Sequence, residues 1–153
     1  MPRETGRATV FAAGLHGTRS VASTDATRPR LCHDRRVRPT VLIVDDHAEF
    51  RASAAELLAA EGFDVVGSAG DGAAGFELAL RLRPQLVLLD IQLPDRDGFA
   101  VAAQLAEVEQ APAVVLISSR EAAAYGRRVS EAPVRGFIAK RDLTGAALAA
   151  FVA

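Results

Sequence analysis

Five short apolar runs, each followed by a segment with helical spacing, constrain the fold of this chain most strongly. The runs are rich in Val, Ile, Leu and Ala, as strands covered on both faces must be. They are "TVLIVD" (40–45), "FDVVGSA" (63–69), "QLVLLD" (85–90), "AVVLIS" (113–118) and "VRGFIA" (134–139). This alternation predicts an α/β domain over residues 40–153, a doubly wound five-stranded parallel sheet with helices on both faces.

The segments between the runs end at residues that stop helices. The stops are Gly62, Pro84 and Pro112. The fourth segment, "EAAAYGRRVS" (121–130), contains Gly126 and little apolar surface, so it is expected to form the loosest helix. In the last segment, residues 142–153, Asp142 is the predicted N-cap.

Charge divides the chain into two parts. Residues 1–39 hold eight Arg and three acidic residues without a sustained hydrophobic period, and are expected to be a basic, disordered extension. An organellar transit peptide is the alternative interpretation. Residues 40–153 hold ten basic and sixteen acidic residues, which argues against direct nucleic-acid binding. The single cysteine and the lack of a long apolar stretch favour a cytoplasmic protein without a membrane span.

Polar residues gather where the predicted strands end. In a parallel sheet these ends meet at one edge, where ligands bind. Polar ends are also ordinary, because the chain leaves the core there. Three carboxylates on neighbouring strands repel one another, however, unless a cation such as Mg2+ lies between them. The residues are Asp45, Asp46, Asp90, Ser118 and Lys140.

Such a set suits phosphoryl chemistry. A carboxylate can attack a phosphoryl group, and Mg2+ with an ammonium group can neutralise the charge that develops on the phosphoryl oxygens. Lys140 can supply the ammonium group, and Ser118 can donate a hydroxyl hydrogen bond. The residues therefore predict a site that makes and breaks an aspartyl phosphate.

Four motifs carry a family resemblance: "VLIVDDH", "LLDIQLPDRDG", "VVLISSR" and "RGFIAK". In order and spacing they resemble the receiver domain of two-component response regulators, which implies a flavodoxin-like fold with strand order 2-1-3-4-5. The resemblance implies that Asp90 is the phosphoacceptor and Lys140 its conserved-type lysine. It also implies Mg2+ ligation by Asp46 directly, by Asp45 mainly through water, and by the backbone carbonyl of Gln92.

The same resemblance assigns the switch residues. Ser118 matches the hydroxyl residue that turns toward the phosphoryl group, and Phe137 matches the switch aromatic, although some members have Tyr there. Arg141 replaces the proline that many members have after the lysine, which leaves the geometry of the last loop open. The implied role is a signalling domain and not a conventional enzyme.

The implied phosphoryl donor is a sensor histidine kinase or a phosphotransfer protein. The implied output is a downstream protein bound by the fourth helix, fifth strand and fifth helix, with homodimerisation left open. Tyr125, Arg127 and Arg128 belong either to that surface or to a solvated helix face. Because the sequence ends in its last helix, a stand-alone regulator is expected, and a phosphate sink without a switch surface is an alternative.

Two other functions compete with this interpretation. "GDGAAG" (70–75) matches a dinucleotide-binding fingerprint, but Asp71 would face the pyrophosphate, so a tight turn with Asp71 as helix cap is preferred. An aspartate-nucleophile phosphohydrolase would use a D-x-D motif on the first strand, whereas Asp95 and Asp97 fall in a loop after the third. His47, at the start of the first helix, is expected to have a surface or capping role.

Overall fold

A parallel sheet forms the centre of the computed structural model, which describes residues 9–10 and 38–152. Its five parallel strands are β2 (Thr40–Val44), β3 (Asp64–Ala69), β4 (Leu86–Asp90), β5 (Ala113–Ser118) and β6 (Gly136–Ala139). They lie in the order β3-β2-β4-β5-β6. This order confirms the predicted 2-1-3-4-5 arrangement, and the sheet reverses its direction of growth between β2 and β4.

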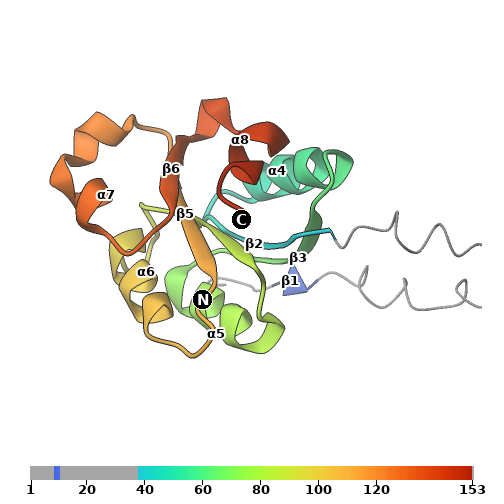
Figure 1. The fold of residues 1–153 in the computed structure, drawn as a ribbon, viewed down its shortest axis with the longest axis horizontal. Helices are drawn as coiled ribbons and strands as arrows, with labels where there is room; N and C mark the ends of the chain where they lie inside the picture. Colours follow the sequence, from blue (N-terminus) through green and yellow to red (C-terminus); the bar gives the residue numbers. More distant parts are fainter. Residues whose placement is uncertain (1–8, 11–37, 153) are drawn as a thin grey trace, which may run out of the picture.

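Helices cover both faces of the sheet (Figure 1). They are α4 (Ala48–Ala60), α5 (Gly72–Leu82), α6 (Gly98–Ala106), α7 (Arg127–Glu131) and α8 (Gly145–Ala149). Val41 and Ile43 of β2 share one buried cluster with residues of α4 and α8. Leu42 and Val44 share the other with residues of α5 and α6. Because alternate residues of a strand point to opposite faces, β2 is buried on both sides, as its continuous apolar sequence predicts.

The helix ends agree with the sequence in two places and differ in one. Asp71 caps α5, since its carboxylate accepts a hydrogen bond from Ala74 N at 2.7 Å. Gly62, just beyond α4, has φ +102°, the left-handed conformation expected at a helix stop. The predicted cap Asp142 is wrong. Thr144 caps α8 instead, because Asp142 is taken up in a 3-10 turn, η3 (Lys140–Asp142).

The fourth helix is the loosest, as predicted. It is divided into a 3-10 turn, η2 (Ala122–Tyr125), and the short α7, with Gly126 at φ +59° between them. Neither η2 nor α7 contains a buried residue. Few contacts therefore hold this segment against the sheet.

A short sixth strand was not anticipated. β1 (Thr9–Val10) pairs antiparallel with β3 at the edge of the sheet, with Val10 opposite Gly67. It lies within the segment expected to be disordered, and the rest of that segment, residues 1–8 and 11–37, is outside the described residues. No helix in the described part of the chain has the length and apolar character needed to cross a membrane.

Candidate acidic metal site

Asp90 lies at the centre of the polar edge of the sheet. It is the last residue of β4 and is only 2% exposed. Its Oδ1 accepts a hydrogen bond from Gln92 N at 3.1 Å. The central strand therefore places the Asp90 carboxylate at the edge of the sheet. The loop after β4 donates a backbone hydrogen bond to that carboxylate.

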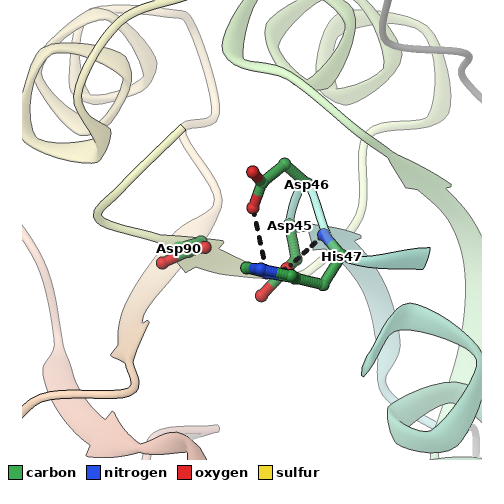
Figure 2. Close-up of side chains that lie close together, drawn as sticks. All are labelled: Asp45, Asp46, His47 and Asp90. Atoms are coloured by element: carbon green, nitrogen blue, oxygen red, sulfur yellow. Dashed lines mark hydrogen bonds and ion pairs between the residues drawn. The ribbon is translucent and has the colours of Figure 1, made fainter. Parts of the chain in front are cut away.

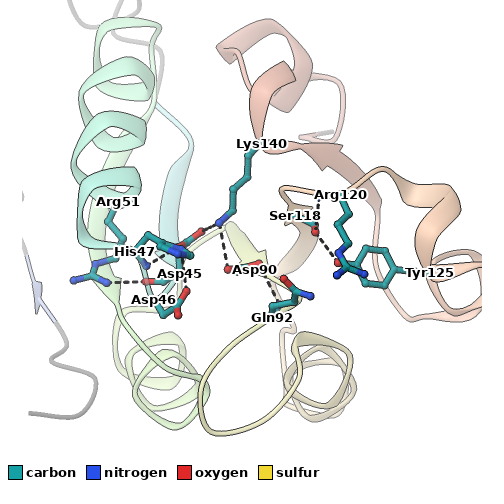
Figure 3. Close-up of polar contacts among 10 residues, drawn as sticks. All are labelled: Asp45, Asp46, His47, Arg51, Asp90, Gln92, Ser118, Arg120, Tyr125 and Lys140. Atoms are coloured by element: carbon teal, nitrogen blue, oxygen red, sulfur yellow. Dashed lines mark hydrogen bonds and ion pairs between the residues drawn. The ribbon is translucent and has the colours of Figure 1, made fainter. Parts of the chain in front are cut away.

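Lys140 joins the carboxylates of two different strands (Figure 3). Its Nζ lies 2.6 Å from Asp45 Oδ2, an ion pair without hydrogen-bond alignment, and donates a hydrogen bond to Asp90 Oδ2 at 3.3 Å. The ammonium group also lies 4.8 Å from the centroid of the Phe50 ring. Because Asp45 is fully buried and the Lys140 side chain is 15% exposed, the ammonium group compensates part of the cost of burying two carboxylates.

The electrostatics of this triad shift two pKa values. Burial and the neighbouring charge of Asp45 raise the pKa of Asp90 to about 6, against the hydrogen bond from Gln92 and the charge of Lys140. Burial by itself would lower the pKa of Lys140. Its contacts with Asp45 and Asp90 outweigh that effect and raise the pKa. Asp90 is thus ionised at neutral pH beside a lysine that stays charged.

Asp45, Asp46, His47 and Asp90 form one cluster (Figure 2). Their potential ligand atoms all lie within 4.8 Å of one another. Asp45 and Asp90 are buried, whereas the Asp46 side chain is 35% exposed and opens the cluster to solvent. Two buried carboxylates with a third at the rim offer the hard oxygen ligands that Mg2+ prefers, with room for the waters that it keeps.

His47 does more in the structure than the sequence suggested. Its ring is largely exposed and makes no side-chain cap on α4. Nδ1 lies 3.2 Å from Asp45 Oδ1 and 3.1 Å from Asp46 Oδ1. Its backbone N–H also donates to Asp45 Oδ1 at 2.8 Å. The expected surface position is therefore correct, but the side chain contacts the carboxylates and not the helix terminus.

Arg51 also belongs to the site, although no pattern in the sequence selects it. From the first turn of α4 its Nη1 donates to the backbone carbonyl of Asp45 at 2.7 Å. From the sequence, an arginine at the fourth position of an amphipathic helix is normally expected to be a solvated side chain. Its role depends on the angle at which α4 leaves β2, which a hydrophobic period does not encode.

Ser118 lies across the edge from the carboxylate cluster (Figure 3). It is fully buried at the end of β5, and its Oγ accepts a hydrogen bond from Arg120 N at 3.0 Å. The same oxygen shares a 2.6 Å hydrogen bond with Tyr125 Oη. Phe137, the predicted switch aromatic, packs against the Tyr125 ring, with 6.3 Å between centroids. The structure thus separates the predicted residues into an acidic group with Lys140 and an aromatic group with Ser118.

Gly98 fixes the backbone beneath Asp90. Its N–H donates to Ile91 O at 2.7 Å at the start of α6. A Cβ at this position would collide with the Asp90 carbonyl oxygen and lie 2.8 Å from Ile91 Cα. Only glycine allows α6 to begin this close to the end of β4.

The two competing motifs serve as helix caps. Asp95 accepts hydrogen bonds from Gly72 N at 2.7 Å and Ala73 N at 2.9 Å, at the start of α5. These donors would face the phosphates in a dinucleotide-binding protein, and here a carboxylate of the same chain occupies them. Asp97 caps α6 through Ala100 N at 2.9 Å. Gly75, the last glycine of the motif, lets α5 approach Val44 closely, because a Cβ there would lie 2.8 Å from the valine methyl groups.

Comparison with known proteins identifies the arrangement. Residues 41–150 match the family described as response regulator receiver domain. The chain is 43% identical over 90 residues to the transcriptional regulatory protein PdtaR of Mycobacterium tuberculosis. That alignment covers 59% of this chain and 44% of PdtaR, so the chain spans less than half the length of that relative.

Solved structures give the same result. A structure of the signal receiver domain of a response regulator named NarL from Mycobacterium tuberculosis aligns with a TM-score of 0.67 and 32% identity, covering 74% of this chain and 96% of that one. The BeF3-activated receiver domain of RstA from Klebsiella pneumoniae aligns with a TM-score of 0.64 and 28% identity, covering 72% and 93%. The match covers most of the chain, and the described chain has the same fold with the acidic residues together at one edge of its sheet. The chain belongs to the family of response regulator receiver domains.

Proposed function

We propose that this receiver domain accepts a phosphoryl group on Asp90. Receiver domains are signalling domains of two-component systems, and in them an acidic pocket generally binds Mg2+. In this chain the proposed ligands are the carboxylates of Asp45, Asp46 and Asp90, with the backbone carbonyl of Gln92. The observation that carries the proposal is the Lys140 ammonium group held between Asp45 and Asp90.

The position of Asp90 at the end of the central strand supports its choice among the three acids. Asp90 is buried, so its carboxylate is desolvated, which favours a nucleophile. Its pKa of about 6 leaves it ionised at neutral pH. Asp46 is the most exposed of the three, and Asp45 carries the contacts of the His47 ring and backbone N–H, so both suit ligation better than attack.

Transfer of the phosphoryl group needs only two reactants, the phosphorylated donor and the Asp90 carboxylate. An Asp90 carboxylate oxygen forms a bond to phosphorus while the bond from phosphorus to the donor's imidazole nitrogen breaks, and that nitrogen keeps the electron pair. Asp45, Asp46 and Asp90 would hold Mg2+, which would supply positive charge to neutralise the phosphoryl oxygens. Lys140 pairs with the new phosphoryl group, and the Ser118 hydroxyl donates a hydrogen bond to it.

We infer that the donor is a sensor histidine kinase or a phosphotransfer protein, and that the domain acts in the cytoplasm. The proposed output face comprises η2, α7, β6 and α8. A groove of about 380 Å³ crosses it, with Glu121 and Ala122 on the η2 side, Phe137 from β6, and Ala147 and Phe151 from the α8 side. A downstream protein that inserts an apolar side chain into this groove would sense Phe137 directly.

Phosphorylation by a small donor tests the proposal. Purified protein is incubated with phosphoramidate, with Mg2+ or with EDTA, and its intact mass is measured. We expect a gain of one phosphoryl group that requires Mg2+ and is lost in Asp90→Asn. Asp142→Asn, which removes an exposed carboxylate near Lys140, is the matched control and should be phosphorylated like the wild type. Equal phosphorylation of Asp90→Asn would refute the assignment.

A further inference from the structure

We propose that Tyr125 is a positioning residue that holds the Ser118 hydroxyl away from Asp90 until a phosphoryl group draws it in. The inference rests on the proposed function, because it requires a phosphoryl group on Asp90. It gives a role to a residue that sequence patterns place only on a partner surface or a solvated face.

The contact itself carries the inference. Ser118 Oγ and Tyr125 Oη lie 2.6 Å apart, and Ser118 is fully buried. The oxygen also accepts from Arg120 N, so this hydroxyl already has two partners. Both partners lie on the side away from Asp90 (Figure 3). A buried hydroxyl with satisfied hydrogen bonds does not turn without losing them.

Turning Ser118 toward a phosphoryl group must break the bond to Tyr125. The side chain moves between staggered positions about a single bond, and Oγ cannot face both directions at once. The phosphoryl group offers three charged acceptor oxygens, whereas Tyr125 offers one neutral phenol. The charge-assisted bond is the stronger, so phosphorylation releases Tyr125.

Release of Tyr125 reaches the surface because few other contacts hold its segment. The Tyr125 ring meets Phe99 edge-on at 6.0 Å and Phe137 at 6.3 Å. Arg128 Nη2 pairs with Asp97 Oδ2 at 2.8 Å, in an exposed ion pair that contributes little. Gly126, between η2 and α7, has φ +59°, and a glycine at this point gives the backbone the freedom to change conformation.

Tyr125 also explains how the switch aromatic Phe137 can respond to Ser118 although Phe137 has no hydroxyl. Phe137 has no polar atom to respond to Ser118, but its ring packs against the tyrosine that does. A change at Ser118 therefore passes through the Tyr125 hydroxyl to the Phe137 ring. That ring lines the groove on the proposed output face.

A thermodynamic cycle tests the inference. Tyr125→Phe keeps the ring but removes the hydroxyl, so Ser118 turns toward Asp90 without losing this bond. With Mg2+ present, calorimetry should show BeF3⁻, the phosphoryl mimic, binding Tyr125→Phe about 2- to 10-fold more tightly than wild type, the worth of one hydrogen bond. In a Ser118→Ala background the same substitution should leave the affinity unchanged. An equal effect in both backgrounds would assign Tyr125 to packing alone.

Tyrosine emission supplies a second readout. Tyr125 is the only tyrosine, and the chain has no tryptophan, so emission reports this residue alone. We expect BeF3⁻ with Mg2+ to change the emission of the wild type but not of Asp90→Asn. If BeF3⁻ binds the wild type without changing emission, and Tyr125→Phe binds it no more tightly, the inference fails and the proposed function stands. If BeF3⁻ does not bind the wild type, the proposed function fails and this inference fails with it.

Discussion

Lys140 Nζ lies 2.6 Å from the buried Oδ2 of Asp45, although the two residues stand near opposite ends of the domain's sequence. The contact joins the first and last parallel strands of the domain at the acidic edge. Asp90, at the end of β4, lies 3.3 Å from the same ammonium group. One cation thus balances two carboxylates that would otherwise repel each other across the edge.

Lys140→Ala should destabilise the metal-free domain. Removing the ammonium group leaves Asp45 and Asp90 buried without their counter-ion, and Lys140 itself is mostly buried, so we expect a loss of about 2–3 kcal/mol in the free energy of unfolding. Urea unfolding in EDTA measures it. Mg2+ should restore part of the loss by replacing the missing charge. Arg141→Ala, which breaks an exposed ion pair with Glu121, is the neighbouring control and should cost about 1 kcal/mol or less. Equal losses in the two variants would contradict the account.

Asp90→Asn should stabilise the metal-free domain at neutral pH. The folded-state pKa of Asp90, about 6, is above its ordinary value of 3.8, so the folded state binds the proton more tightly than the unfolded state. The wild type therefore loses stability as pH rises from about 4 to 6, and the loss is complete above that range. We expect the gain of Asp90→Asn over the wild type to grow from near zero at about pH 4 to on the order of 2 kcal/mol at pH 7.5.

Urea unfolding in EDTA at several pH values measures this gain. Asp142→Asn controls for replacing an exposed carboxylate and should change stability by about 0.5 kcal/mol or less. A gain for Asp90→Asn that is the same at pH 4 and pH 7.5 would show that the charge of Asp90 carries no penalty.

Gly98→Ala should destabilise the domain, although alanine favours helices. At an open helical position this substitution stabilises by roughly 0.5–1 kcal/mol. Here the new Cβ would lie 2.8 Å from Ile91 Cα, so the end of β4 must shift. We expect a loss of about 1–3 kcal/mol in thermal or urea unfolding, as for other overpacked sites. The same shift displaces Asp90 and should slow its phosphorylation. A stabilised Gly98→Ala variant would contradict the tight packing.

The sequence predicts the sheet and its acidic edge well, because both depend on local patterns. Continuous apolar runs identify buried parallel strands, and the polar residue that ends each run then lies at a known edge. Asp45, Asp90 and Lys140 could be placed together on this basis. Asp71 as a cap follows equally from its position before a helical segment.

The remaining features depend on how separate elements meet. Thr144 and Asp142 are both good caps, and only the 3-10 turn at η3 decides between them. The bond between Ser118 and Tyr125 spans the loop after β5, so no periodic pattern predicts it. The approach of Arg51 to the Asp45 carbonyl similarly depends on the path of the backbone between β2 and α4.

Mapping the phosphorylated residue shows whether Asp90 is the phosphoacceptor. The protein is phosphorylated with phosphoramidate and Mg2+, and the acyl phosphate is reduced with borohydride, which converts the modified aspartate to homoserine. Peptide mass spectrometry then locates the homoserine. We expect homoserine at position 90 and aspartate at positions 45 and 46. Homoserine at position 45 or 46 would contradict the assignment of Asp90. Aspartate at position 90 in a protein that gained a phosphoryl group and was then fully reduced would contradict it as well.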